Sequence, residues 1–268
     1  MSDSVLRIFS YLPNPRVWKA LIAAEYLGLS VDVIGDKPKN LGDWLWDFDA
    51  RPLQDEEKAP DNPNARASRR GFSGTLYKTD AFLQTQPYGT VPAAFSPDGQ
   101  TGVFESNSIL RAVARSGSAG HGLYGRSAMD ASRIDSFLDA TLVFGREAQV
   151  YLLGINEISA ELHQRMTGAF EFFLEGIERA LGHHTYIAGD ELTIADIAFV
   201  CDLSQFLRER LMRAGLDAAS LPLVSEGAES IYPRAFAHLF RLIEQPEFIQ
   251  YLGDYTEHFS PKRASETG

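Results

Sequence analysis

Cysteine is nearly absent from this 268-residue sequence, in which Cys201 is the only one. No intramolecular disulfide and no Cys-x-x-Cys pair can form, which excludes a dithiol redox enzyme. Positive charge is also scarce, because 25 lysines and arginines against 36 aspartates and glutamates leave a formal net charge of −11. A nucleic-acid-binding protein needs a basic face, so this balance argues against one.

Long apolar runs are missing as well. No stretch approaches the roughly 18–20 apolar residues of a membrane span, and the N-terminal Met-Ser-Asp-Ser lacks the pattern of a secretion signal. We therefore expect a cytoplasmic protein that binds no membrane. His183 and His184 have no further ligand at metal spacing, so we expect no metal site. Apolar residues make up 44% of the chain, which is enough for a core in one large or two modest domains.

Short patterns in the N-terminal part predict one small α/β domain. Pro15 suits the first turn of a helix, apolar residues then recur at helical spacing, and Gly28 ends the helix. The expected elements are a strand over 5–9, the helix from 15, a strand over 31–34, a hairpin over 91–104 and a helix from 106 to about 115. Strand-helix-strand followed by strand-strand-helix is the thioredoxin-like plan, with a mixed four-stranded sheet.

Residues from about 35 to 80 interrupt this plan as an insert. They are polar, charged and proline-containing, with Trp44, Trp46 and Phe48 near the front. A connection of this length tends to be a functional lid, an interface or a disordered segment. We expect the insert to be one of these three.

The remainder of the chain predicts an all-helical domain. Amphipathic patterns begin near Ser127 and recur over 159–181 and 233–244. Thr193 and Asp196 have the spacing of a helix N-terminal capping box, and Cys201 follows on a predicted core helix, where we expect a buried, inert thiol. The predicted domains are therefore residues 1–116, thioredoxin-like with the insert at about 35–80, and residues 127–258, all-helical.

The predicted hairpin carries the most informative motif, Val91-Pro92 with Glu105-Ser106 behind it. Proline cannot donate to a strand ladder, so a cis bond after Val91 is a good reason for Pro92 here. The backbone of Val91 would then be free to pair with an extended peptide. Ser106 falls where a helix should begin, and such an N-terminus attracts a carboxylate. Together these features predict a site for a small acidic peptide; the alternatives are a turn proline and a simple N-cap serine.

These residues resemble the glutathione-binding half of the glutathione transferases. Val91-Pro92 is similar to the cis-proline dipeptide of that family, and Glu105-Ser106 to the pair that holds the γ-glutamyl end. The resemblance implies a glutathione site at Val91, Pro92, Glu105 and Ser106. It further implies that Gln86, or Gln84, provides a polar contact to the glycyl end.

The residue that would activate the glutathione thiol stays open between several candidates. A transferase stabilises the thiolate with a donor near the start of its first helix. Tyr11 lies near the place of the tyrosine in tyrosine-type classes, and Asn14 near that of the serine in serine-type classes; Arg16 could add positive charge. We rank Asn14 first, then Tyr11, Arg16 and Ser10. The alternative is that Tyr11 belongs to the core and Asn14 is only a cap.

Three further stretches look most similar to the transferase-like domain of the elongation factor gamma subunit. They are the pattern from Asn14 to Ala24, the run 103–107 and the segment 245–253. The resemblance implies a cytoplasmic glutathione S-transferase, a homodimer, whose glutathione thiolate attacks an apolar electrophilic acceptor. The alternative is a non-catalytic protein-interaction module with the insert as its docking surface.

Overall fold

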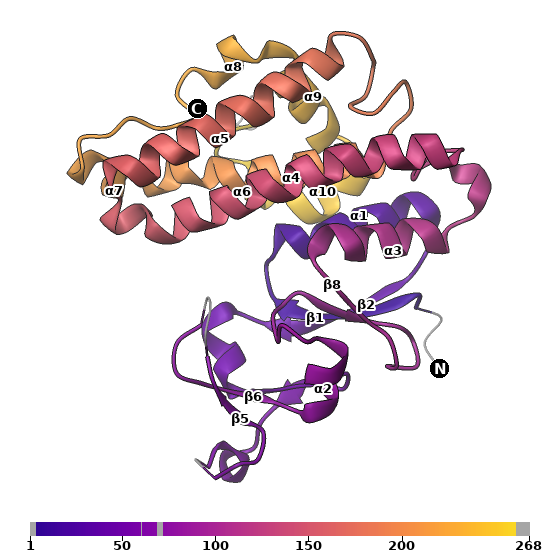
Figure 1. Cartoon of the computed structure of the whole chain (residues 1–268), viewed down its shortest axis with the longest axis vertical. Coiled ribbons are helices and arrows are strands. Elements are labelled where there is room, and N and C mark those ends of the chain that lie inside the picture. The colour runs from indigo at the N-terminus through magenta and orange to yellow at the C-terminus, as the bar shows by residue number, and fades with distance from the viewer. Residues whose placement is uncertain (1–3, 60, 69–71, 261–268) are drawn as a thin grey trace. The chain divides into compact units, whose positions relative to one another are not determined.

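The computed structural model describes residues 4–59, 61–68 and 72–260. It divides into two compact units, Met1–Gly117 and Ser118–Gly268. Each unit has its own core, and Figure 1 shows the helices and strands of both.

The first unit is built on a mixed four-stranded sheet in the order β2-β1-β7-β8. Its elements are β1 Leu6–Tyr11, α1 Pro15–Leu27, β2 Val31–Asp36, β7 Ala93–Phe95, β8 Gly102–Phe104 and α3 Ser106–Ser116. β1 runs parallel to β2 and antiparallel to β7, and β7 is antiparallel to β8. Helices α1 and α3 pack side by side against this sheet (Figure 1). The predicted thioredoxin-like sheet is therefore confirmed, including Pro15 in the first turn of α1 and Gly28 at its end, where φ is 63°.

The insert is folded where the structure describes it, which excludes a disordered segment, one of the three predicted alternatives, for those residues. Its elements are η1 Pro38–Asp43, β3 Trp44–Trp46, β4 Arg51–Pro52, η2 Asp55–Lys58, β5 Ala65–Ala67 and β6 Thr75–Lys78, followed by α2 Asp80–Thr85. The four strands form a second sheet in the order β4-β3-β6-β5, and β3 and β6 are parallel.

Apolar residues of the insert share one core with the first sheet. Trp46 is 1% exposed, donates its indole N–H to the Leu41 carbonyl at 2.9 Å, and meets Phe9 of β1 edge-on with ring centroids 5.5 Å apart. Phe82 of α2 and Phe95 of β7 belong to the same cluster. Burying aromatic side chains of this size contributes most of the stability of a small core. The insert is thus an integral layer of the first unit.

All regular secondary structure among the described residues of the second unit is helical. Its α-helices are α4 Ala128–Gly154, α5 Ala160–Leu181, α6 Ile194–Phe206, α7 Arg213–Ala218, α8 Ala228–Ile231, α9 Pro233–Ile243 and α10 Pro246–Leu252. Short 3-10 turns join them: η3 Ala119–His121, η4 Ile155–Glu157, η5 Leu207–Met212 and η6 Asp254–Thr256. Among the described residues no helix has the length and apolar character needed to cross a membrane.

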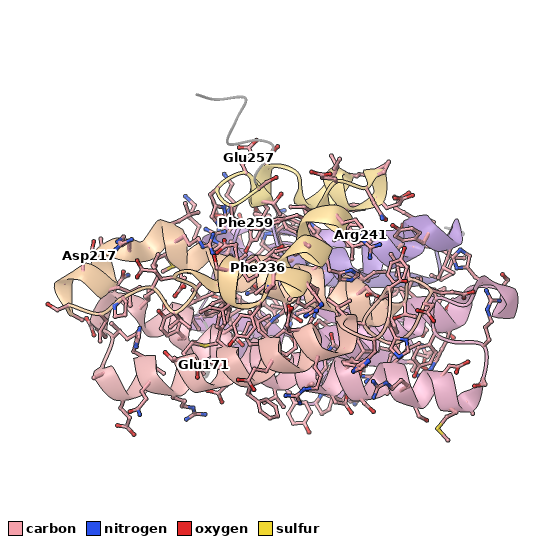
Figure 2. The ribbon with its side chains drawn as sticks, turned by 90° about the horizontal axis from the view of Figure 1, so that it is seen from above. Glu171, Asp217, Phe236, Arg241, Glu257 and Phe259 are labelled. Carbon is pink, nitrogen blue, oxygen red and sulfur yellow. The ribbon has the colours of Figure 1, made fainter. Side chains whose placement is uncertain are left out.

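Helix α6 lies at the centre of the second unit, and its residues are buried on all sides, including the Cys201 thiol. Aromatic rings surround it, among them Phe144 and Phe173, which stack with centroids 4.4 Å apart. Figure 2 shows the arrangement of side chains, with Phe236 of α9 inside the unit and Asp217 at its outer edge.

The predicted capping box begins α6, and the structure adds a partner that the sequence did not reveal. Asp196 Oδ2 accepts the backbone N–H of Thr193 at 2.8 Å, as expected for the box. Its Oδ1 accepts from the Ile187 N–H at 3.0 Å and pairs with His238 Nε2 at 2.8 Å. Asp196 is fully buried, so these bonds hold one carboxylate between a loop, a helix start and α9.

Candidate functional site

The turn before β7 offers an unpaired stretch of backbone. The Val91–Pro92 bond is cis, as predicted. Among the described residues the Val91 N–H and C=O take part in no backbone hydrogen bond, while the Val91 side chain packs against the core of the first unit. The fixed side chain and the free main chain make this turn suited to pair with an extended peptide.

A lysine of the insert supports this turn and had no distinguishing signal in the sequence. Lys78 Nζ donates to the Gly89 carbonyl at 2.6 Å and lies 4.7 Å from the centre of the Trp46 ring. Burial lowers the pKa of Lys78. Because Gly89 lies two residues before Val91, β6 of the insert is connected directly to the turn.

Gln86 requires a correction, because it does not face outward. It is 1% exposed, and its Nε2 donates to the Val103 carbonyl at 3.0 Å and lies 3.3 Å from that of Ala94. The side chain therefore bridges β7 and β8. We reassign Gln86 from a ligand contact to a support of the hairpin.

Glu105 and Ser106 lie together at the start of α3, as the sequence predicted. Glu105 is the N-cap, yet its side chain makes no capping bond and is exposed. Its backbone has φ 66°, a region that costs a non-glycine residue on the order of 1–3 kcal/mol. Ser106 is buried apart from 6% of its surface, and its N–H has no partner among the described residues. The exposed Glu105 carboxylate can bind a cation, and the Ser106 N–H beside it can bind an anion.

The side chain of Lys19 contacts this end of α3, and the sequence analysis did not identify Lys19 as part of the site. It lies on α1, is 1% exposed, and donates from Nζ to Asn107 Oδ1 at 2.9 Å and to Ser106 Oγ at 3.3 Å. A charged residue in the middle of the apolar pattern of a core helix was the available signal.

Asn14, ranked first for thiol activation, is placed as a cap instead. Its Oδ1 accepts the backbone N–H of Arg16 at 3.0 Å, its Nδ2 donates to Ser10 Oγ at 3.0 Å, and its side chain is fully buried. Both ends of the amide are thus engaged inside the unit, as expected of an N-cap. The structure therefore corrects the ranking: Asn14 and Ser10 fix the loop against α1.

Tyr11 ends β1 and keeps a partly exposed side chain. Burial raises the pKa of Tyr11, and the charge of Arg16 opposes this to a smaller extent. The phenol is accordingly a neutral hydrogen-bond donor at neutral pH. Tyr11 also packs against the core cluster of the first unit, in line with the alternative that it belongs to the core, and its role toward a thiol stays a prediction. Within the described ranges no three His, Cys, Asp or Glu side chains gather to hold a metal ion.

A sheet of this order with a cis-proline turn, followed along the chain by a helical unit, defines the glutathione S-transferase fold. Residues 160–242 match the family model for the glutathione S-transferase C-terminal domain. The epsilon-class glutathione S-transferase of the housefly, Musca domestica, superposes with a TM-score of 0.62 at 17% identity, over 97% of this chain and 98% of that one. A glutathione S-transferase from Methylobacillus flagellatus with glutathione bound gives a TM-score of 0.60 at 14% identity, over 92% and 98%.

Over residues 160–242 the chain matches a glutathione S-transferase domain, and along most of its length it resembles elongation factor 1-gamma. Elongation factor 1-gamma 2 of Oryza sativa is 28% identical over 246 residues, 90% of this chain and 47% of its own length. The elongation factor 1-gamma of Artemia salina is 24% identical, over 97% and 50%. The chain thus spans about half the length of these relatives. The glutathione S-transferase-like protein LUC7 of a Fusarium species is 25% identical over 92% of both chains.

Proposed function

We propose that this chain is a cytoplasmic glutathione S-transferase. The observation that carries the proposal is that one unit contains two backbone groups without a hydrogen-bond partner among the described residues. They are the main chain of Val91 and the N–H of Ser106. Glutathione is a peptide with a γ-glutamyl carboxylate and ammonium at one end, so it needs both a strand edge and an anion site. No metal is required by this chemistry.

The cysteinyl backbone and the γ-glutamyl end of glutathione each have a partner of the right type in the first unit. The cysteinyl backbone pairs with Val91 beside Pro92, the γ-glutamyl carboxylate is bound at Ser106, and the ammonium is bound by the Glu105 carboxylate. The strained φ of Glu105 supports a functional reason for this residue, because a position that costs stability without a role is expected to be replaced.

The thiol end relies on Tyr11 and Arg16. A neutral phenol donates a hydrogen bond to a thiolate, and a nearby guanidinium adds positive charge, so both favour the ionised sulfur. The thiolate then attacks an electrophilic carbon of an apolar acceptor: the C–S bond forms as the leaving group departs with its electron pair, and the thiol proton passes to solvent. Conjugation and thiolytic ether cleavage follow this step and differ in the acceptor. Deglutathionylation would use the same glutathione site, but there the thiolate attacks the sulfur of a glutathionyl group, so that an S–S bond forms as the bond from that sulfur to the acceptor breaks and the acceptor takes up a proton. The Fusarium relative, whose name is transferase-like and which matches over 92% of both chains, supports this proposal.

Calorimetric titration with glutathione tests the site. The Glu105→Ala, Ser106→Ala double variant is expected to lose at least tenfold in affinity, because it removes a charge-assisted hydrogen bond and the ammonium partner. Ser116→Ala, at the exposed last turn of α3, is the matched control and should bind as the wild type does. Unchanged affinity in the double variant would sink the site assignment. Thiolate absorbance on the same samples reports whether the bound sulfur is ionised.

A second candidate is a non-catalytic interaction module. Two observations favour it: the amide of Asn14 is engaged as a cap, and the elongation-factor relatives are named for translation rather than for transfer chemistry. This candidate predicts no turnover of simple electrophiles even at saturating glutathione. Turnover that depends on Tyr11 would overturn it in favour of the transferase.

We also propose a homodimer. Exposed apolar side chains on α4 and α5, including Val143, Leu153 and Phe172, support a protein interface on these helices. Light scattering of the wild type should give twice the chain mass, and Phe172→Glu should lower it; a monomeric wild type would contradict the proposal.

A further inference from the structure

Lys19 is a fully buried lysine that contacts the start of α3. Lysine is almost never fully buried unless its ammonium group has partners, and burying a charge costs several kcal/mol before pairing. Here Nζ reaches Asn107 Oδ1 and Ser106 Oγ, the side chains of the first two residues of α3. A methionine of similar length would fill the same space between α1 and α3 without that cost, so packing alone does not account for the lysine.

The ammonium group determines the direction of the Ser106 hydrogen bonds. An ammonium has donors and no acceptor, so in its bond with Lys19 the Ser106 oxygen accepts. The hydroxyl hydrogen of Ser106 is then left to donate elsewhere. The Ser106 N–H also has no partner among the described residues. Both donors of Ser106 are therefore available to an anion at the N-terminal end of α3.

Asn107 is oriented in the same way. Its Oδ1 accepts from Lys19 at 2.9 Å, so the carboxamide oxygen, which would repel a carboxylate, is held on the α1 side. Without the lysine the Ser106 hydroxyl could instead donate to this oxygen, and the anion site would lose a donor.

We propose that Lys19 is a positioning residue of the glutathione carboxylate subsite, which it orients through Ser106. The inference rests on the proposed function, because it assigns a role within the same site. Lys19 itself touches no substrate. It fixes Ser106 as a donor toward the γ-glutamyl carboxylate and places a positive charge behind the hydroxyl.

A double-mutant cycle with glutathione as the probe tests this role. Calorimetric titration is carried out on the wild type, Lys19→Met, Ser106→Ala and the double variant, with Lys39→Met, an exposed lysine of the same unit, as the control. We expect Lys19→Met to weaken glutathione binding about tenfold, as for a lost bond to a charged group, and to change affinity little once Ser106 is alanine. With a model electrophile, KM for glutathione should rise while kcat at saturation stays near that of the wild type.

Thermal unfolding separates positioning from a structural role. Replacing a buried charge by an apolar residue of similar volume is often neutral or stabilising, so the melting temperature of Lys19→Met should not fall although affinity does. Lys19→Gln, which is one atom shorter and replaces the ammonium by an amide NH2 that still donates, should bind with intermediate affinity and serves as the second variant if the methionine variant does not fold. A glutathione analogue that lacks the γ-glutamyl α-carboxylate should bind wild type and Lys19→Met equally.

The outcomes distinguish the two proposals. Absence of glutathione binding by the wild type overturns the proposed function and this inference with it. Wild-type binding with unchanged affinity in Lys19→Met overturns the inference alone. An equal loss in the wild-type and Ser106→Ala backgrounds, or a matching loss for the decarboxylated analogue, shows that Lys19 acts by another route and also overturns it.

Discussion

The left-handed backbone of Glu105 predicts which of two variants, glycine or alanine at position 105, is the more stable. With φ at 66°, a residue carrying a Cβ is strained by on the order of 1–3 kcal/mol. Glycine escapes this strain, although it loses about 0.5–1 kcal/mol more conformational entropy on folding than alanine does. At an ordinary position alanine is therefore the more stabilising of the two residues, whereas at position 105 we expect glycine to be.

The comparison is between Glu105→Gly and Glu105→Ala, since both remove the carboxylate and only one keeps a Cβ. The glycine variant should be more stable than the alanine variant by about 1–2 kcal/mol, which corresponds to a melting temperature higher by roughly 2–8 °C in differential scanning calorimetry. Glutathione titration should show a similar loss of affinity in both, because the ammonium partner is gone from each. An alanine variant that melts at the same temperature or higher would refute the left-handed backbone and the strain inferred from it.

Three further predictions follow from the packing and the charges. Asp196→Ala should destabilise the helical unit by about 3–5 kcal/mol, because it leaves the Ile187 N–H and His238 without their buried acceptor. Asp130→Ala, in the exposed capping box of α4, is the control and should cost only about 1 kcal/mol. Equal losses of stability for the two variants in urea unfolding would contradict this explanation. Trp46→Ala should cost about 3–5 kcal/mol, whereas Leu211→Ala, at a residue 60% exposed, should cost little. A small effect at Trp46 would mean that the insert is not part of the core. The hydrogen bonds from Arg51 and from the Gln54 N–H lower the pKa of Glu57 from 4.5 to about 2. The stability that these bonds contribute is therefore fully present above pH 4.5 and is lost as the pH falls through about 2. Arg51→Gln should raise that pKa toward 4.5 in a carboxyl NMR titration, and no change would exclude Arg51 as the cause.

Local signals in the sequence were sufficient for the first sheet and for most helices. Pro15, Gly28 and the Thr193–Asp196 spacing act within one or two turns of chain, so they report directly on helix starts and ends. The cis bond at Val91–Pro92 was also predictable, because few other arrangements explain a proline there.

The insert and the details of the site depend on contacts between distant residues. Its strands are two to four residues long, too short for a period-two pattern, and β3 pairs with β6 across some 30 residues of chain. Asn14 and Gln86 were taken for ligand contacts because residue type does not reveal burial; each proved to be fully or almost fully buried. Lys19 was missed because its partners lie 87 and 88 positions away.

The bond from Lys78 to Gly89 links the insert physically to the turn of the proposed glutathione site. A macromolecule that docks on the insert and stiffens β6 would tighten the hold on glutathione, and by reciprocity glutathione would strengthen that docking by the same factor. The proposed enzyme and the proposed interaction module would then be two uses of one coupling. Titrating any partner of the insert with and without glutathione would measure the coupling, and identical affinities would exclude it.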